Sequence, residues 1–361
     1  MRRATFLATI LLVAVVAPVT SAGAVEDVSK NGPSAVQQTC SFPVTETDAT
    51  GTEVTVEGEP QRIVTLSPSA AQTMWEIGGK SKVVGVTKYA TYLDGAEAKT
   101  NVSGSGMTTV VAEKVVSLKP DLVLAPNVVP DQTVKQLRSA GLTVYKFEEA
   151  KSLDDVYAKT NLTGRLTGEC GGASETVAWM KDRVSTVREA VKGEDNPRVL
   201  YTMGGGYTAG EGTFINEIIE TAGGENVAAE AGIQGYKKIS NEVVVERDPQ
   251  WIITPTGIEI PDAYGSTAAV KNNQTVTLDT NYVNQPAPRV VYPITKLAKT
   301  FHPEAYQQAN VTTTTTSSTG SDETNTTDTT TATTESTGQP GFGPGVAAVA
   351  AAAVALLARR E

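Results

Sequence analysis

Two stretches of the sequence repeat one pattern of helix, turn and strand signals. Both 113–126 and 242–255 begin with a glutamate, reach a first proline seven positions later and a second proline thirteen positions later. Because the residue before a proline disfavours the helical conformation, each unit predicts a short helix, a tight turn and a buried strand. The repeat therefore predicts two lobes of similar build, with a ligand cleft between them.

Short β-branched apolar runs alternate with helical patterns in both halves of the chain. In the first half, strands are predicted at 63–66, 83–86, 122–124 and 142–147, and helices at 69–77, 110–118 and 133–140. In the second half, strands are predicted at 199–202, 251–254 and 276–278, and helices at 214–222 and 289–301. This alternation predicts an α/β fold with mainly parallel sheets in both lobes, preceded by a hairpin over 42–59.

A helical segment joins the predicted lobes. Two helical patterns follow one another at 153–167 and 173–192, and the second would span ~30 Å at ~1.5 Å per residue. We therefore predict that one long helix connects the lobes. The chain divides into a signal peptide (1–24), an N-terminal extension and hairpin (25–59), an N-terminal lobe (60–151), an interlobe helical segment (152–193), a C-terminal lobe (194–306), a threonine-rich disordered stalk (307–339) and a sorting and anchoring tail (340–361).

The amino terminus has the features of a secretion signal. Met1-Arg2-Arg3 precedes an apolar run and then the small residues Ala22-Gly23-Ala24, which is the order found in cleavable signal peptides. A buried N-terminal helix is the alternative. Export predicts that the mature chain begins near Val25 and works outside the cytoplasm.

The carboxyl terminus predicts attachment to the cell surface. Residues 311–337 are dominated by threonine with hardly an apolar side chain, which is typical of an extended, O-glycosylated stalk. Pro340, Gly341 and Phe342 then precede an apolar run and two arginines, an order that resembles the PGF-CTERM sorting signal of archaeal surface proteins. The resemblance implies processing by an archaeosortase-type enzyme and a lipid anchor. An ordinary C-terminal membrane anchor is the alternative and gives the same topology.

Export also affects the interpretation of cysteines and sequons. Cys40 and Cys170 are the only cysteines, and an oxidising compartment favours a disulfide between them. A sequon at Asn161 falls within a predicted helix. The candidate glycosylation sites are the N-x-[ST] sequons at Asn101, Asn273, Asn310 and Asn325.

Composition argues against several function classes. The formal charge of −10 and the lack of a basic stripe in the sequence disfavour nucleic-acid binding. One histidine and two cysteines leave too little material for a metal site, so we expect no resident metal and no other cofactor. No nucleophile elbow, zinc-protease motif or Ser–His–acid set is visible in the sequence. We therefore expect a protein that is not an enzyme; an extracellular hydrolase on a two-lobed scaffold is the alternative.

Three residues at helix starts or glycine turns are candidates for ligand contact. Ser67 ends a predicted strand and opens a helix, so its hydroxyl either caps that helix or contacts a ligand. Glycines around Gly206 would let a bulky ligand approach the backbone. Arg289 opens the last helix, where a cation gains nothing from the helix dipole, so it needs an anionic partner. That partner is either a ligand carboxylate or a structural acid.

Five tyrosines lie in loops after strands or before helices. Their rigid amphipathic rings suit a large planar or amide-rich ligand, although each one taken singly is also compatible with ordinary surface. These residues are Tyr89, Tyr92, Tyr207, Tyr236 and Tyr282.

Motifs in both halves resemble one protein family. Residues 62–69, 83–87 and 118–125 are similar to the amino-terminal lobe of the substrate-binding proteins of ABC importers for cobalamin and ferric siderophores. Residues 214–226, 248–250 and 288–291 are similar to the second lobe. The resemblance covers 61–303 and implies two α/β lobes joined by a single spanning helix, with the ligand between the lobes.

The resemblance also implies a function. We expect a monomeric, exported protein that captures a metal chelate, cobalamin by preference, and delivers it to a dimeric ABC permease with its ATPase subunits. A ferric siderophore or haem is the alternative ligand, and a surface-layer component is a third possibility that leaves these motifs unexplained. The ligand-binding set implied is Ser67, Tyr89, Tyr92, Met107, Asn127, Gly206, Tyr207, Tyr236, Tyr282 and Arg289.

One glutamate in each repeat is a candidate for docking to the permease. Glu113 and Glu242 occupy the same repeat position, and in cobalamin-binding relatives the matching glutamate of each lobe meets arginines of the permease. Without the resemblance, both would be explained as acids favoured by the dipole at the start of a helix.

Overall fold

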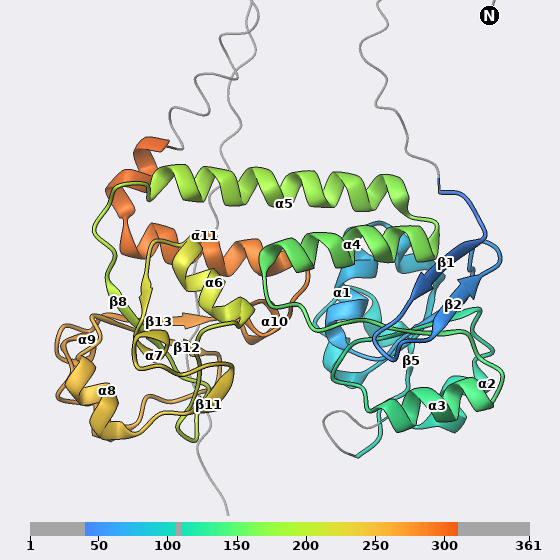
Figure 1. The fold of residues 1–361 in the computed structure, drawn as a ribbon, viewed down its shortest axis with the longest axis horizontal. Helices are drawn as coiled ribbons and strands as arrows, with labels where there is room; N and C mark the ends of the chain where they lie inside the picture. The colour runs from blue at the N-terminus through green and yellow to red at the C-terminus, as the bar shows by residue number, and fades with distance from the viewer. Residues whose placement is uncertain (1–39, 106–109, 310–361) are drawn as a thin grey trace, which may run out of the picture. The chain divides into compact units, whose positions relative to one another are not determined.

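The computed structural model describes residues 40–105 and 110–309 (Figure 1). No helix within these ranges is long and apolar enough to cross a membrane. Several predictions concern residues outside the described ranges: the signal peptide, the ligand contact of Met107, the sequons at Asn310 and Asn325, the stalk from residue 310 onward, and the sorting motif at Pro340, Gly341 and Phe342. The predicted start of the stalk at residue 307 is wrong, because residues 303–309 are helical.

The first lobe is built on a five-stranded sheet in which every pairing is parallel. The strand order is β5 (Thr100–Asn101), β4 (Val83–Val86), β3 (Ile63–Thr65), β6 (Leu122–Ala125) and β7 (Val144–Lys146). Its helices are α1 (Pro68–Glu76), α2 (Ala112–Ser117) and α3 (Asp131–Ser139). The predicted hairpin precedes the sheet as the antiparallel pair β1 (Val44–Thr47) and β2 (Glu53–Val56).

Both faces of this sheet are covered by apolar side chains. On one face Met74 of α1 packs in a cluster with Ile63 and Leu122, and on the other Leu137 of α3 packs in a cluster with Val64. Since successive strand residues point to opposite faces, a strand covered on both sides must be apolar throughout. This explains why β3 and β6 are continuous buried runs rather than alternating patterns.

The second lobe contains a four-stranded parallel sheet and a small antiparallel ribbon. The sheet order is β10 (Glu225–Asn226), β8 (Arg198–Tyr201), β12 (Trp251–Pro255) and β13 (Thr275–Leu278). The ribbon pairs β9 (Tyr207–Ala209) with β11 (Tyr236–Lys238). The helices of this lobe are α6 (Phe214–Thr221), α7 (Val227–Glu230), α8 (Asn241–Arg247), α9 (Ala268–Lys271), α10 (Thr280–Val283) and α11 (Val291–Phe301). Short 3-10 helices add to the regular elements, among them η2 (Lys88–Ala90) and η5 (Pro288–Val290).

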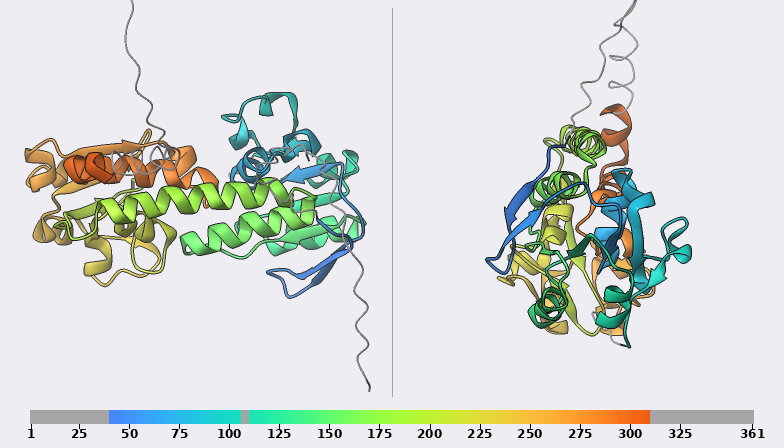
Figure 2. Two further views of the ribbon diagram at one scale, coloured as in Figure 1. Left: turned by 90° about the horizontal axis from the view of Figure 1, so that it is seen from above. Right: turned by 90° about the vertical axis from the view of Figure 1, so that its right-hand side faces the viewer.

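Two long helices connect the lobes. α4 (Leu153–Thr167) and α5 (Cys170–Ala190) pack against each other and lie side by side in Figures 1 and 2. Near its start, α5 contacts the first lobe through a hydrogen bond from Thr176 Oγ1 to the Glu76 carbonyl of α1 (3.0 Å), whereas Met180 belongs to the core cluster of the second lobe. The predicted long connecting helix is therefore confirmed as α5. α4 makes a second connection, with Leu166 in a cluster of the first lobe and Val156 in the core of the second.

The predicted disulfide is present between Cys40 and Cys170, whose Cα atoms are 5.5 Å apart. It ties the start of the described chain to the first residue of α5.

The internal repeat corresponds to equivalent structures in the two lobes. α2 leads into β6, α8 leads into β12, and each of these strands is paired on both sides in its sheet. The residue before the first proline takes a left-handed conformation in both units, with φ of 46° at Lys119 and 44° at Asp248. A single residue in the left-handed conformation ends a helix and turns the chain sharply, so only a few residues separate the helix from the strand in each unit.

Candidate functional site

The predicted ligand residues gather where parallel strands end. Ser67, Tyr89 and Asn127 follow β3, β4 and β6 in the first lobe. Tyr207 follows β8 and Tyr282 follows β13 in the second. Open α/β sheets bind ligands outside the carboxyl ends of their strands, so these residues occupy the edge of each sheet at which a ligand is expected.

The buried Ser67 side chain has a capping role. Its Oγ accepts a hydrogen bond from the Ala70 backbone N–H (3.4 Å) and shares a second one with Ser69 Oγ (2.8 Å). These contacts stabilise the start of α1 and agree with the capping interpretation. A ligand contact by Ser67 stays a prediction.

Gln72 of α1 connects the two lobes, and its side chain is fully buried. Its Nε2 donates hydrogen bonds to Tyr92 Oη (2.7 Å) and to the Asn281 carbonyl of α10 (3.2 Å). Its Oε1 accepts the backbone N–H of Arg289 (2.9 Å). Two of these three hydrogen bonds thus hold one side chain of the first lobe against two segments of the second, and the third stays within the first lobe.

Arg289 has a structural partner in the first lobe. Its Nε donates to Glu76 Oε1 of α1 (2.7 Å), and both side chains are 22% exposed. Of the two partners that the sequence allows for Arg289, the structure contains the acid. We call Gln72, Glu76, Asn281 and Arg289 the interlobe clamp. The sequence does not indicate Gln72 and Glu76, because two polar residues within a helix carry no local sign of a partner in the other lobe.

Tyr92 and Tyr282 line the interlobe clamp from opposite lobes. Their ring centroids are 6.4 Å apart in an edge-on arrangement, and the guanidinium of Arg289 lies 5.7 Å from the centroid of the Tyr282 ring. Burial raises the pKa of Tyr92 to about 12, so its hydroxyl is neutral at physiological pH. Both rings therefore pack between the lobes, which leaves only part of each available to a ligand.

The other three predicted tyrosines are more exposed. Tyr89 in η2 is 39% exposed, Tyr207 in β9 is 47% exposed and Tyr236 in β11 is 40% exposed. Gly204, Gly205 and Gly206 precede Tyr207 in the left-handed region, which tightens the turn between β8 and β9 in a way that most residues with a Cβ would resist. The structure thus supplies open aromatic surface from both lobes.

Tyr236 lies next to the first lobe. Partial burial raises the pKa of its hydroxyl, and the Glu149 carboxylate, which follows β7, raises it further. Tyr236 also contributes to the raised pKa of the buried Tyr201, which burial alone already raises strongly. The hydroxyl of Tyr236 therefore feels charged or polar groups of both lobes.

The remaining predicted residues are half-buried or exposed on the surface of the two lobes. Asn127 is half-buried in the turn after β6, while the sequon asparagines Asn101 and Asn273 are exposed. Glu113 and Glu242 are exposed in the first turns of α2 and α8, and neither forms an ion pair within the described part of the chain. A hydrogen bond from its own backbone N–H, followed by one from Ser240, lowers the pKa of Glu242.

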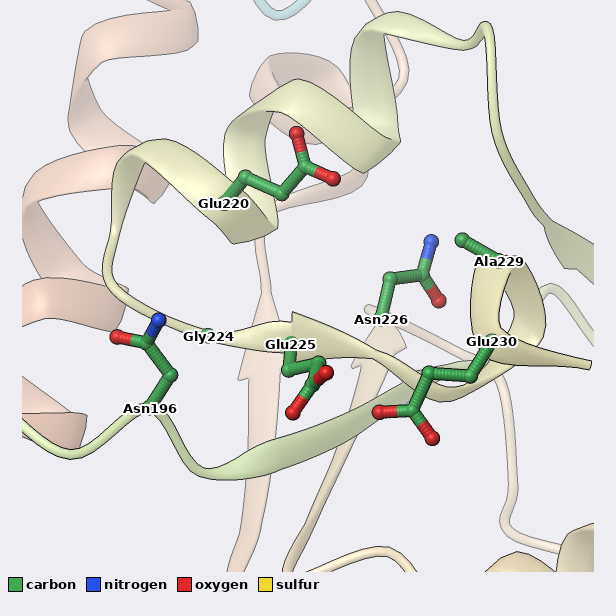
Figure 3. A pocket seen from close by; sticks show the side chains of 7 residues that line it. All are labelled: Asn196, Glu220, Gly224, Glu225, Asn226, Ala229 and Glu230. Carbon is green, nitrogen blue, oxygen red and sulfur yellow. The ribbon is translucent and has the colours of Figure 1, made fainter.

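A hollow on the edge of the second sheet contains none of these residues (Figure 3). Its polar lining consists of Asn196, Glu220, Glu225, Asn226 and Glu230. Burial raises the pKa of Glu230, and the like charge of Glu225 adds to the effect. Over 40–105 and 110–309 no group of three or more His, Cys, Asp or Glu is arranged to hold a metal ion.

The sequence matches known proteins over most of its length. Residues 63–282 match the profile of a family described as periplasmic binding protein. The chain is 45% identical over 310 residues to the cobalamin-binding protein of Halobacterium salinarum, an alignment that covers 82% of this chain and 84% of that protein. It is 32% identical over 321 residues to an uncharacterized ABC transporter substrate-binding lipoprotein of Bacillus subtilis, which covers 85% of this chain and 99% of that one.

A solved structure has the same arrangement of elements. The periplasmic haem-binding protein of Roseiflexus sp. in its apo form superposes with a TM-score of 0.62 at 27% identity, over 69% of this chain and all of that one. The predicted two-lobed α/β architecture is therefore confirmed both by the elements themselves and by this likeness.

Proposed function

Because this chain belongs to the periplasmic binding protein family, we propose that it captures cobalamin outside the cell and delivers it to an ABC importer. Proteins of this family are exported solute-binding proteins that work with the permease and ATPase subunits of ABC importers. They are not enzymes, so the expectation that the chain is not an enzyme is confirmed and the hydrolase alternative is discarded.

The observation that carries the choice of cobalamin is the 45% identity to a cobalamin-binding protein over most of both chains. The exposed rings of Tyr89, Tyr207 and Tyr236 support it, since they offer amphipathic surface of the kind that suits a large planar ligand with amide groups. The transported chelate would be cargo rather than a resident cofactor.

Haem is the second candidate ligand. The likeness to a haem-binding protein at 27% identity favours it over a ferric siderophore, although both remain alternatives. A thermal-shift assay of the secreted protein with cobalamin, haem and a ferric siderophore separates the three, because a ligand that binds only the folded state raises the melting temperature. We expect the largest increase with cobalamin. An increase with haem or siderophore and none with cobalamin would reverse the order.

We propose further that Glu113 and Glu242 dock the protein onto the permease. Both carboxylates are exposed, both belong to the first turn of a short helix, and the repeat places them at equivalent positions in the two lobes. One acid per lobe matches a permease made of two like subunits. Exposed ion pairs contribute only ~0.2–1 kcal/mol each, so these would act mainly on orientation and on the rate of encounter.

Replacing both glutamates tests this docking role. Glu113→Ala combined with Glu242→Ala should leave ligand affinity unchanged while uptake of labelled cobalamin by cells falls sharply. The matched control replaces Glu246 and Lys114, exposed residues of the same two helices, with alanine and should leave uptake intact. Normal uptake by the double glutamate variant, or loss of its ligand affinity, would contradict the docking assignment.

The tail sequence supports a finer proposal about location. We propose that the chain is held at the outer face of an archaeal cell membrane by its C-terminal segment, after recognition of Pro340, Gly341 and Phe342 by an archaeosortase-type enzyme. Mass analysis of the membrane-bound protein should find a C-terminus near Gln339 with an added lipid. An intact terminus at Glu361 would favour an uncleaved anchor. The same analysis would identify the glycosylated sequons.

A further inference from the structure

We propose that Lys238 binds an anionic group at the edge of the ligand, so that the site selects chelates carrying a phosphate or a carboxylate beside the planar ring. This inference rests on the proposed function, because it assumes that a chelate binds between the lobes. It goes further in assigning a chemical preference to one side chain.

The ribbon of β9 and β11 places two tyrosines and one lysine on the same face. Tyr207 is paired directly with Lys238, and Tyr236 is paired with Ala209. Residues that alternate along a strand point to the same side, and so do direct cross-strand partners. Tyr207, Tyr236 and Lys238 therefore form one surface, which we call the platform.

The Lys238 ammonium is positioned over an aromatic ring. Its Nζ lies 5.4 Å from the centroid of the Tyr207 ring, and the residue is exposed. It takes part in no ion pair within the parts of the chain that the structure describes. A lysine ammonium has three N–H donors, and a ring face does not use them all, so Lys238 can still donate to a ligand oxygen.

The platform lies where a ligand would meet both lobes. Glu149 of the first lobe is close enough to Tyr236 to raise the pKa of its hydroxyl. The turn of Gly204, Gly205 and Gly206 leads directly into Tyr207, and the Gly206 carbonyl accepts the Ile239 backbone N–H (2.9 Å) next to Lys238. A ring stacked on the tyrosines would thus bring its edge to the lysine.

The charge of the chain gives this lysine a function. With a formal charge of −10, the protein as a whole repels anions, and Glu149 adds a negative charge beside the platform. An anionic ligand edge therefore needs a local cation. Lys238 provides this cation on the same face as the two tyrosines. Hydrogen bonds from an ammonium to a phosphate or carboxylate are stronger than those between neutral groups.

Two sources could supply the anion, and paired ligands distinguish them. Cobalamin carries a phosphodiester in its nucleotide loop, which cobinamide lacks. Haem carries two carboxylates, which are neutral in its dimethyl ester. The dissociation constants of all four compounds would be measured with the full-length secreted protein and with Lys238→Gln, Lys238→Arg and Lys237→Gln.

Lys237→Gln is the matched control because its side chain leaves the opposite face of the same strand. We expect Lys238→Gln to weaken binding of the member of each pair that carries the phosphate or carboxylate about tenfold and to leave the member that lacks this anion within twofold, with Lys238→Arg close to wild type. If Lys238→Gln loses affinity for cobalamin but not for cobinamide, the anion bound by Lys238 is the phosphodiester. If it loses affinity for haem but not for the dimethyl ester, the anion is a carboxylate.

Two results would overturn the inference while the proposed function stands. One is unchanged affinity of Lys238→Gln for every compound that the wild type binds. The other is an equal loss for both members of a pair, which would mean that Lys238 shapes the ribbon rather than binds the anion. Wild-type protein that binds none of the four compounds would contradict the proposed function itself, and the inference with it.

Discussion

Gln72 and Arg289 are joined by a hydrogen bond of 2.9 Å from the Arg289 backbone N–H to the Gln72 side-chain oxygen, although 217 positions separate them in the chain. The same side chain reaches Tyr92 and the Asn281 carbonyl. Because Gln72 is fully buried, its amide depends on these groups for its hydrogen bonds.

The first prediction concerns this bridge between the lobes. Gln72→Leu keeps the approximate volume but leaves the Arg289 N–H and the Asn281 carbonyl without their partner, so we expect the free energy of unfolding to fall by about 3 kcal/mol. Urea unfolding followed by tyrosine and tryptophan fluorescence measures the change. Gln136→Leu on the exposed side of α3 is the control and should change stability by less than about 0.5 kcal/mol. Equal effects of the two substitutions would show that the interlobe clamp contributes no stability.

The bridge also shows the limits of reasoning from sequence. Strands such as β3 and β6 were predicted because they are short, continuous runs rich in β-branched apolar residues, and helices α4 and α5 were predicted from their longer helical patterns. The repeat was predicted from two proline spacings and corresponds to α2–β6 and α8–β12. The contact of Gln72 with Arg289 has no local pattern, since it depends on how two lobes meet.

Short elements were missed for a related reason. β9, β11 and α10 contain only three or four residues each, which is too few to show a period, and tertiary contacts decide their conformation. Consequently the sequence identified Tyr207, Tyr236 and Tyr282 as candidates but not the ribbon that groups the first two with Lys238. The left-handed conformations of Lys119 and Asp248 were likewise not predicted, because neither residue is glycine.

The second prediction concerns the close contact of α5 with α1. A Cβ added at Gly172 would lie 2.0 Å from the Ile77 carbonyl oxygen, whereas one added at Gly171 would meet nothing within 4 Å. Gly172→Ala must therefore displace backbone, and we expect a loss of at least about 2 kcal/mol in the free energy of unfolding. Gly171→Ala should be neutral or stabilise by about 0.5–1 kcal/mol, because alanine is the better helix former. Chemical denaturation of the two variants under the same conditions measures both free energies of unfolding. A Gly172→Ala protein as stable as Gly171→Ala would contradict the contact.

The third prediction concerns the buried Lys159 of α4. Its Nζ has no hydrogen-bond partner among the described residues and lies 5.5 Å from the centroid of the Phe147 ring. Burial lowers the pKa of Lys159 to about 8. Below pH 8 the amine is charged in both states, so the folded state bears the full cost of the buried charge. Between pH 8 and the unfolded value of ~10.4, only the unfolded state binds the proton, so stability rises with pH by ~1.4 kcal/mol per unit.

Lys159→Met removes this cost. The variant should be more stable than wild type by about 3 kcal/mol at pH 7, and the gap should shrink as the pH approaches 10. Unfolding in urea at several pH values measures the gap, with the exposed Lys135→Met as the control that should show no such trend. A gap that does not depend on pH would mean that Lys159 does not titrate in this way.

The fourth prediction concerns the disulfide. Replacing Cys40 and Cys170 together with serine opens a link between residues 130 positions apart, and loop closure of the unfolded chain predicts a loss of about 2–4 kcal/mol. Ligand affinity should be unchanged, since neither cysteine belongs to the platform or to the interlobe clamp. The melting temperature and the affinity of the double variant are the two readouts. A large loss of affinity in a protein that remains folded would assign the disulfide a part in the site.

Isothermal titration of the full-length secreted protein with cobalamin is the most direct test of the proposed function. Our account predicts saturable binding of one cobalamin per chain with a dissociation constant in the micromolar range or tighter. No heat change with cobalamin, together with micromolar or tighter binding of haem or a ferric siderophore under the same conditions, would contradict it.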